Sequence, residues 1–200
     1  MQATALNTSP PGLQQNTERL LLEGAMACAR RYGMTKINIK RVAEECGVTR
    51  QTVYRYYPSS QALVEAVSWH VVSGIIQQLD KHLTRFHGFD NKVVESIIFL
   101  SDKIPKDPYL NQYFSTHYLH SQNMEELFSD TTLQYCQQYL HVIYGEDKLA
   151  KDKAKWLDSL AELLLRTIVS LIVTPSKRTS GKKGRLEYLN LWLKPLLAEP

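Results

Sequence analysis

The sequence predicts an all-α fold, in which a small N-terminal three-helix domain is joined through a long fourth helix to a larger helical domain. No stretch sustains the apolar–polar alternation of a half-buried strand, and no hairpin-type turn dipeptide lies between apolar runs. Instead, helix N-caps and glycine or proline breaks recur along the chain. With 200 residues, the chain is long enough for one large domain or two small ones.

The first helix is expected from about Thr17 to Tyr32, with Gly33 as its C-terminal stop. Residues 1–15 are rich in Pro, Gln, Ser and Thr, which predicts a disordered N-terminal tail. One face of the helix is expected to be apolar and to carry Leu22, Ala25, Met26 and Ala29.

Two short helices and a longer one follow. Asn38 is a suitable N-cap for "IKRVAEEC", which Gly47 ends. Thr49 caps "RQTVYRYY", and after Pro58 a fourth helix, capped by Ser59, reaches toward residue 87. Residues 16–60 are therefore predicted as one small helical domain.

Residues 61–200 are expected to form the larger helical domain. Helices are predicted from residue 90 to about 103, from Asp107-Pro108 onward, over "TTLQYCQQYLHVIY" up to Gly145, and from residue 152 to about 174. Pro195 is expected to end the final helix near residue 191. One side of that helix carries four leucines: Leu186, Leu189, Leu193 and Leu196.

The positive charge of the chain is concentrated near its start. The net charge is +4, and residues 1–57 contain eight Lys or Arg against four acidic residues, so the whole excess lies in this segment. A compact basic segment beside a neutral body is typical of a surface that binds a polyanion. An unevenly solvated surface would give the same distribution.

Several kinds of site are not indicated. Cys28, Cys46 and Cys136 have no CxxC spacing and their number is odd, which favours neither a disulfide framework nor a thiolate zinc site. The most apolar stretch, residues 163–173, is short for a membrane span and contains Arg166. The N-terminus lacks the pattern of a secretory signal. We therefore expect a cytoplasmic protein with no cofactor, no metal ion and no membrane contact.

The second and third helices have the spacing of a helix-turn-helix. Ala43 is small where two crossing helices must approach closely, and Gly47 can take the positive φ of a sharp turn. Val48 and Val53 can fix the third helix against the second. If Val53 and Tyr57 face inward, the third helix turns its polar residues outward.

Such a helix fits the major groove, where Arg and Gln side chains can form paired hydrogen bonds to guanine and adenine. Tyr and Thr hydroxyls suit phosphate oxygens, and the free N–H groups that start the second helix favour an anion. The alternative is a polar, solvated helix whose tyrosines belong partly to the core. The predicted DNA-binding residues are Lys36, Asn38, Lys40, Thr49, Arg50, Gln51, Thr52, Tyr54, Arg55 and Tyr56.

Residues 37–67, "INIKRVAEECGVTRQTVYRYYPSSQALVEAV", resemble the DNA-binding region of the tetracycline-repressor (TetR) family of bacterial regulators. Residues 42–43, 47–48 and 53–57 fill the places of that family's Ile/Val-Ala pair, Gly-Val turn and recognition-helix motif. The resemblance implies that Tyr54 contacts a phosphate and that other polar residues of the third helix lie near the DNA: Arg50, Thr52 and Tyr56.

Two positions depart from the family pattern. Gln51 stands where the family often has glycine or another small residue, so its longer side chain is expected to reach a base or a phosphate. Ser60 stands where the family usually has a lysine that contacts a phosphate. That contact is therefore expected to be weakened or lost.

The last two helices are predicted to form a dimer interface. The stretch "LLLRTIVSLIV" is apolar nearly all round, and "LEYLNLWLKPLL" adds a second apolar surface. Both can pack with their copies in a twofold four-helix arrangement, and the family resemblance implies the same. The alternative is that both helices close the core of a single chain. The predicted interface residues are Leu164, Ile168, Leu171, Ile172, Leu189, Trp192, Leu193 and Leu196.

The central helices are rich in amphipathic aromatic residues, which line many small-molecule sites. The resemblance implies an effector cavity between the fourth and eighth helices. The alternative is a core whose tyrosines reach water, and Arg166 has Asp158 or Glu162 as possible partners. The candidate pocket residues are Phe99, Tyr113, His117, Tyr118, Tyr135, Tyr139, Trp156 and Arg166.

The sequence therefore predicts a TetR-like DNA-binding transcriptional regulator, a ligand-responsive repressor that binds a near-palindromic operator as a homodimer. Its expected partners are a double-stranded DNA operator, an unknown small-molecule effector and a second copy of itself. One alternative is a helical dimeric interaction module with a degenerate DNA-binding head. Another is a helical enzyme, although no HExxH, P-loop, paired Glu-x-x-His or GxSxG motif occurs.

Overall fold

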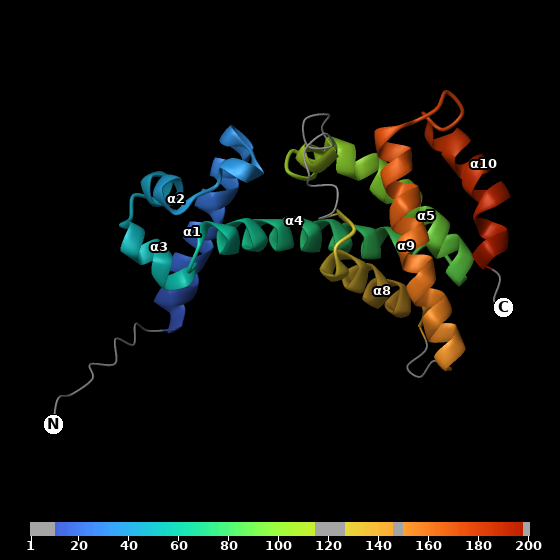
Figure 1. The fold of residues 1–200 in the computed structure, drawn as a ribbon, viewed down its shortest axis with the longest axis horizontal. Helices are drawn as coiled ribbons and strands as arrows, with labels where there is room; N and C mark the ends of the chain where they lie inside the picture. The colour runs from blue at the N-terminus through green and yellow to red at the C-terminus, as the bar shows by residue number, and fades with distance from the viewer. Residues whose placement is uncertain (1–10, 115–126, 146–149, 198–200) are drawn as a thin grey trace. The chain divides into compact units, whose positions relative to one another are not determined.

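The structure is a computed structural model, and it describes residues 11–114, 127–145 and 150–197. Within these ranges all regular structure is helical, which confirms the all-α fold class. The chain divides into two compact units, residues 1–74 and residues 75–200. The division falls inside the long helix α4 (Ser60–Leu83), and the helices of each unit can be followed in Figure 1.

The first unit contains α1 (Pro11–Tyr32), α2 (Ile39–Cys46), α3 (Arg50–Tyr56) and the first part of α4. A 3₁₀ turn (Met34–Lys36) connects α1 to α2. Helix α1 begins at Pro11 and so includes residues 11–15, which were expected to belong to the tail.

The helix ends of this unit are set by local hydrogen bonds, as the sequence predicts. The Asn38 side chain accepts a hydrogen bond from the Arg41 amide at 3.0 Å, and the Thr49 hydroxyl accepts one from the Thr52 amide at 3.1 Å. Gly47 lies between the two helices in the left-handed conformation, at φ 65°.

The three helices of the first unit share one apolar core. Leu21, Val42 and Val53 are fully buried there. The buried face of α1 differs from the predicted one, because Leu22 and Met26 are only half-buried. The buried positions of this helix are Leu21, Gly24, Ala25, Cys28 and Ala29.

The second unit is built around α5 (Phe89–Lys103), which packs against α8 (Asp130–Tyr144), α9 (Lys151–Val173) and α10 (Lys182–Trp192). The apolar side chains of α5 share the main core with leucines of the two last helices: Val93, Val94, Ile97, Ile98, Leu157, Leu164, Leu189 and Leu193. A smaller cluster around Leu79, Leu83 and Ile143 joins the end of α4 to α8.

One expectation for this unit is corrected and another is confirmed. The helix predicted from Asp107-Pro108 is, over the described residues, a 3₁₀ turn at Leu110–Phe114, and the Asp107 carboxylate accepts the amides of Tyr109 and Leu110 at 2.9 Å each. The final helix ends at Trp192 and continues as a 3₁₀ turn over Lys194–Leu197, close to the predicted break.

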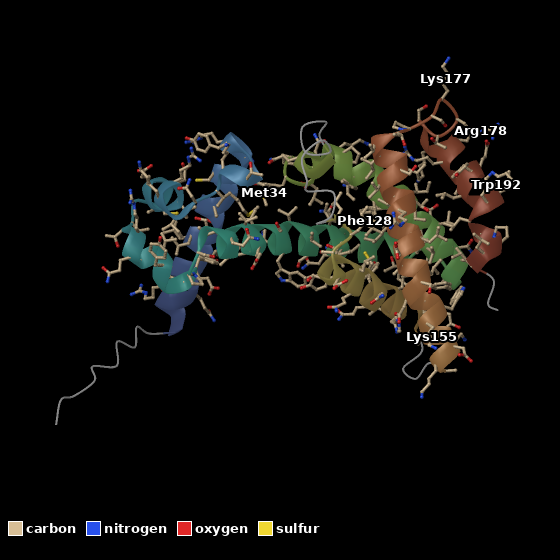
Figure 2. All side chains as sticks on the ribbon, viewed as in Figure 1. Met34, Phe128, Lys155, Lys177, Arg178 and Trp192 are labelled. Atoms are coloured by element: carbon tan, nitrogen blue, oxygen red, sulfur yellow. The ribbon has the colours of Figure 1, made fainter. Side chains whose placement is uncertain are left out.

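The first turns of α10 are tied to α5 by an ion pair. Arg185 of α10 is only 7% exposed and forms an ion pair with Asp102 of α5. Lys177 and Arg178 point away from the helices at the turn between α9 and α10 (Figure 2). Over the described ranges, the chain has no helix that is both long enough and apolar enough to cross a bilayer.

Candidate DNA-binding interface

Helix α3 has one apolar side and one polar side. Val53 is completely buried and Tyr57, directly after the helix, is 8% exposed, so both anchor α3 in the core as predicted. Burial also raises the pKa of the Tyr57 phenol. The opposite side presents Arg50, Gln51 and Arg55 to solvent, and Tyr54 is 54% exposed even though it is an aromatic residue.

Several side chains on α3 contact one another. The hydroxyls of Thr49 and Thr52 lie 3.0 Å apart in a hydrogen bond that reinforces the helix cap. The guanidinium of Arg55 lies 5.1 Å from the ring centroid of Tyr56 and donates to its hydroxyl at 3.5 Å. These contacts restrict the rotamers of four of the predicted DNA-binding residues, and so prepare them for a fixed geometry.

The start of α2 differs from its expected state. The Asn38 side chain caps the Arg41 amide, and its amide nitrogen donates to the Lys36 carbonyl at 3.3 Å. The amide of Ile39 donates to the Ser60 hydroxyl at 3.4 Å. Two N–H groups that were expected to be free for an anion are therefore used inside the protein. Lys36 and Lys40 remain exposed beside them.

Arg41, which no sequence pattern singled out, lies in the same place. Its guanidinium donates to the Lys36 carbonyl at 2.6 Å and lies 5.1 Å from the ring centroid of Tyr32. The guanidinium of Arg31 lies 5.8 Å from the same ring centroid and is paired with Glu45 at 3.2 Å. The sequence signal for this cluster is the excess of positive charge in residues 1–57.

The candidate pocket residues do not gather in one place. Phe99 and Tyr139 belong to the smaller apolar cluster, whereas Trp156 packs on the main core with its ring 5.8 Å from that of Phe89. Tyr135 is exposed, and Arg166 is exposed and paired with Glu162 at 2.6 Å. The side chain of Tyr113 and the whole of His117 and Tyr118 lie outside the described residues.

Two polar pairs hold the end of α4 to its neighbours. The Tyr139 hydroxyl donates to Asp80 at 2.7 Å, and burial together with this carboxylate raises the pKa of Tyr139 well above its usual value. The His82 ring and the largely buried Glu95 carboxylate form a second pair at 3.1 Å. Both pairs join α4 to helices of the second unit, α8 and α5 respectively.

The predicted dimer residues fall into two groups. Leu164, Leu171, Leu189 and Leu193 are buried in the core of their own chain. Ile168 and Ile172 are half-buried. Trp192 and Leu196 are 62% and 57% exposed. Three further exposed apolar residues on the last two helices were not among those predicted: Leu163, Tyr188 and Leu191.

Comparison with known proteins gives a family match over the first unit. Residues 21–67 match the model of the tetR family of bacterial regulatory proteins. The nucleoid occlusion factor SlmA of Haemophilus influenzae is 26% identical over 87 residues, which are 44% of this chain and 40% of that protein. The match thus spans less than half of this curated relative.

Solved structures resemble a much larger part of the chain. The fatty acid degradation regulator FadR of Bacillus halodurans has a TM-score of 0.56 at 13% identity and covers 94% of this chain and 98% of its own. A TetR-family regulator of Streptomyces coelicolor has a TM-score of 0.58 at 14% identity and covers 96% and 100%. At this identity the likeness establishes the fold.

The family match covers the helix-turn-helix whose caps, turn and buried residues are described above, and the resemblance drawn from residues 37–67 is confirmed. Over residues 21–67, the N-terminal unit is therefore similar to the tetR family of bacterial regulatory proteins.

Proposed function

We propose that the protein is a transcriptional regulator that binds double-stranded DNA through residues 16–60 and carries its dimer and effector surfaces in residues 61–200. The observation that carries the proposal is the polar side of α3. Val53 fixes this helix in the core, while Arg50, Gln51 and Tyr54 are exposed on it. An exposed helix with this set of side chains suits the major groove.

The proposed division of labour follows from the contacts of each side chain. Arg50 and Gln51 lie at the start of α3, where recognition helices contact base edges. Tyr54, Lys36 and Lys40 provide hydroxyl and ammonium groups for phosphates, which position the helix. Asn38, in contrast, acts on DNA binding through the α2 cap.

A titration of duplex DNA against salt tests this proposal directly. Each phosphate neutralised by the protein should lower the slope of log affinity against log salt by about 0.9. A protein that uses several Lys and Arg residues should therefore lose affinity steeply as salt increases. Binding that is absent, or that does not depend on salt, would contradict the DNA-binding proposal.

A homodimer is the proposed functional form. Leu163, Tyr188, Leu191, Trp192 and Leu196 expose apolar surface on α9, α10 and the following turn, and a second copy would remove this surface from water. Two copies of α3 could then read two half-sites of a near-palindromic operator. Trp192→Glu should convert the protein to monomers in analytical ultracentrifugation, whereas Lys177→Glu, on the adjacent loop, should leave the dimer intact.

We further propose that the regulator is a repressor whose DNA affinity changes when a small molecule binds to the second unit. The support is the pair of polar contacts that join α4 to α8 and α5, Tyr139–Asp80 and His82–Glu95. Helix α4 runs from the recognition unit into the second unit, so a ligand that favours one arrangement of these contacts would act on it. Native mass spectrometry of protein purified from cells should detect a bound small molecule. A reporter gene under the control of the operator should be expressed more strongly when the gene for this regulator is deleted.

A further inference from the structure

The N-terminus of α2 is closed by a residue from another helix. Ser60 is the first residue of α4, and its hydroxyl oxygen accepts the hydrogen bond of the Ile39 amide at 3.4 Å across 21 residues of sequence. Asn38 closes the same helix end from its own side by accepting the Arg41 amide. Both contacts lie inside the first unit.

Ser60 is not needed to start its own helix. Ser59 does this, because its hydroxyl accepts the Ala62 amide at 3.1 Å. The two adjacent serines therefore have different tasks: Ser59 caps α4, and Ser60 joins the first turn of α4 to the first turn of α2. Ser60 is half-buried, and Ile39 is 5% exposed, so the contact is sheltered by the core.

We propose that Ser60 is a positioning residue for DNA binding, which fixes the start of α2 and thereby the exposed Lys36 and Lys40 beside it. This rests on the proposed DNA-binding function. The family resemblance implies a phosphate-contacting lysine at this position, and a neutral serine cannot supply that charge. In this chain Ser60 holds the first turn of α2 in place, and Lys36 and Lys40 supply the positive charge for a phosphate.

The geometry explains why this matters for affinity. The first turn of α2 and the 3₁₀ turn before it carry Lys36 and Lys40 on exposed, flexible side chains. Without the Ser60 contact, the Ile39 amide must find another acceptor or remain unsatisfied, and this turn becomes free to fray. Each contact that this turn makes with DNA then costs additional conformational entropy, which weakens binding.

The test compares three changes at residue 60 with a change at its neighbour, in the full-length protein. Ser60→Ala should increase the exchange rate of the Ile39 amide, measured by NMR without DNA, and weaken DNA binding by roughly fivefold, the scale of one hydrogen bond. Ser60→Thr, which keeps the hydroxyl, should restore both quantities. Ser59→Ala is the matched control, because it removes a cap of α4 but should leave Ile39 exchange unchanged.

Ser60→Lys separates positioning from charge. The lysine should expose the Ile39 amide as alanine does, and should steepen the salt dependence by about 0.9 for each additional phosphate that the protein neutralises. If the exchange rate of the Ile39 amide is unchanged in Ser60→Ala, the inference is wrong. Weaker DNA binding in that case would mean that Ser60 contacts DNA directly. Unchanged DNA binding would mean that Ser60 has no role in it. If the unaltered protein does not bind DNA, the proposed function fails, and increased Ile39 exchange in Ser60→Ala would still show the hydrogen bond.

Discussion

A methyl group added at Gly24 should destabilise the protein, and the sign of its effect should reverse when Cys46 is shortened. Gly24 is buried on α1 at the place where α1 crosses α2. A Cβ atom at this position would overlap the Sγ of Cys46, whose thiol donates to the Leu20 carbonyl at 3.5 Å. The glycine therefore leaves room for the Cys46 side chain between the two helices.

Two opposing effects set the magnitude. Overpacking a core by one methyl group costs about 1–3 kcal/mol. Replacing glycine by alanine inside a helix gains about 1 kcal/mol through backbone entropy. In the natural background, Gly24→Ala should therefore lower the free energy of unfolding by between about 0 and 2 kcal/mol. In a Cys46→Ala background the overlapping sulfur is gone, and the same change should gain about 1 kcal/mol.

Urea unfolding of the four proteins in this cycle, followed by far-UV circular dichroism, gives the coupling energy between the two positions. Gly74→Ala is a matched control, because Gly74 is also a helical glycine but a Cβ there meets no atom within 4 Å. It should stabilise the protein in both backgrounds. An equal effect of Gly24→Ala with and without the Cys46 thiol would refute the predicted overlap between position 24 and the Cys46 side chain.

Two further predictions concern the second unit. Asp102→Ala should lower the free energy of unfolding by about 3–5 kcal/mol, because it leaves the buried Arg185 guanidinium without its carboxylate. Glu162→Ala, which breaks the exposed pair on α9, should lower it by under about 1 kcal/mol in the same urea assay. Burial raises the pKa of the Cys136 thiol to about 11, so at pH 8.5 it stays protonated and should react with iodoacetamide many times more slowly than in urea. A fast native reaction would mean that Cys136 is exposed.

The features that the sequence predicted well are those set by neighbouring residues. Asn38, Thr49 and Ser59 cap their helices through hydrogen bonds to amides three residues away, and Gly47 takes the left-handed conformation of a sharp turn. These interactions need no information about distant parts of the chain, so the helix boundaries of the first unit follow from local chemistry.

The features that the sequence could not predict depend on which helices meet. Leu189 and Leu191 are two residues apart in one apolar stretch, yet Leu189 is fully buried and Leu191 is 62% exposed, because α10 packs on α5 through one side only. The Arg185–Asp102 pair joins residues 83 positions apart. The Ser60 contact to Ile39 likewise depends on how α4 begins beside α2.

The central claim is that the polar side of α3 binds DNA. The most direct test compares the removal of one arginine on α3 with the removal of one lysine elsewhere. Arg50→Ala and Lys177→Ala each remove one exposed positive charge, the first from α3 and the second from the loop before α10. Their Kd values should be measured by fluorescence anisotropy at one fixed salt concentration, on a duplex selected from a random pool by the unaltered protein. The account predicts that Arg50→Ala raises Kd by about tenfold or more, on the scale of a lost base contact, and that Lys177→Ala leaves it unchanged. Equal Kd values for the two variants would contradict it.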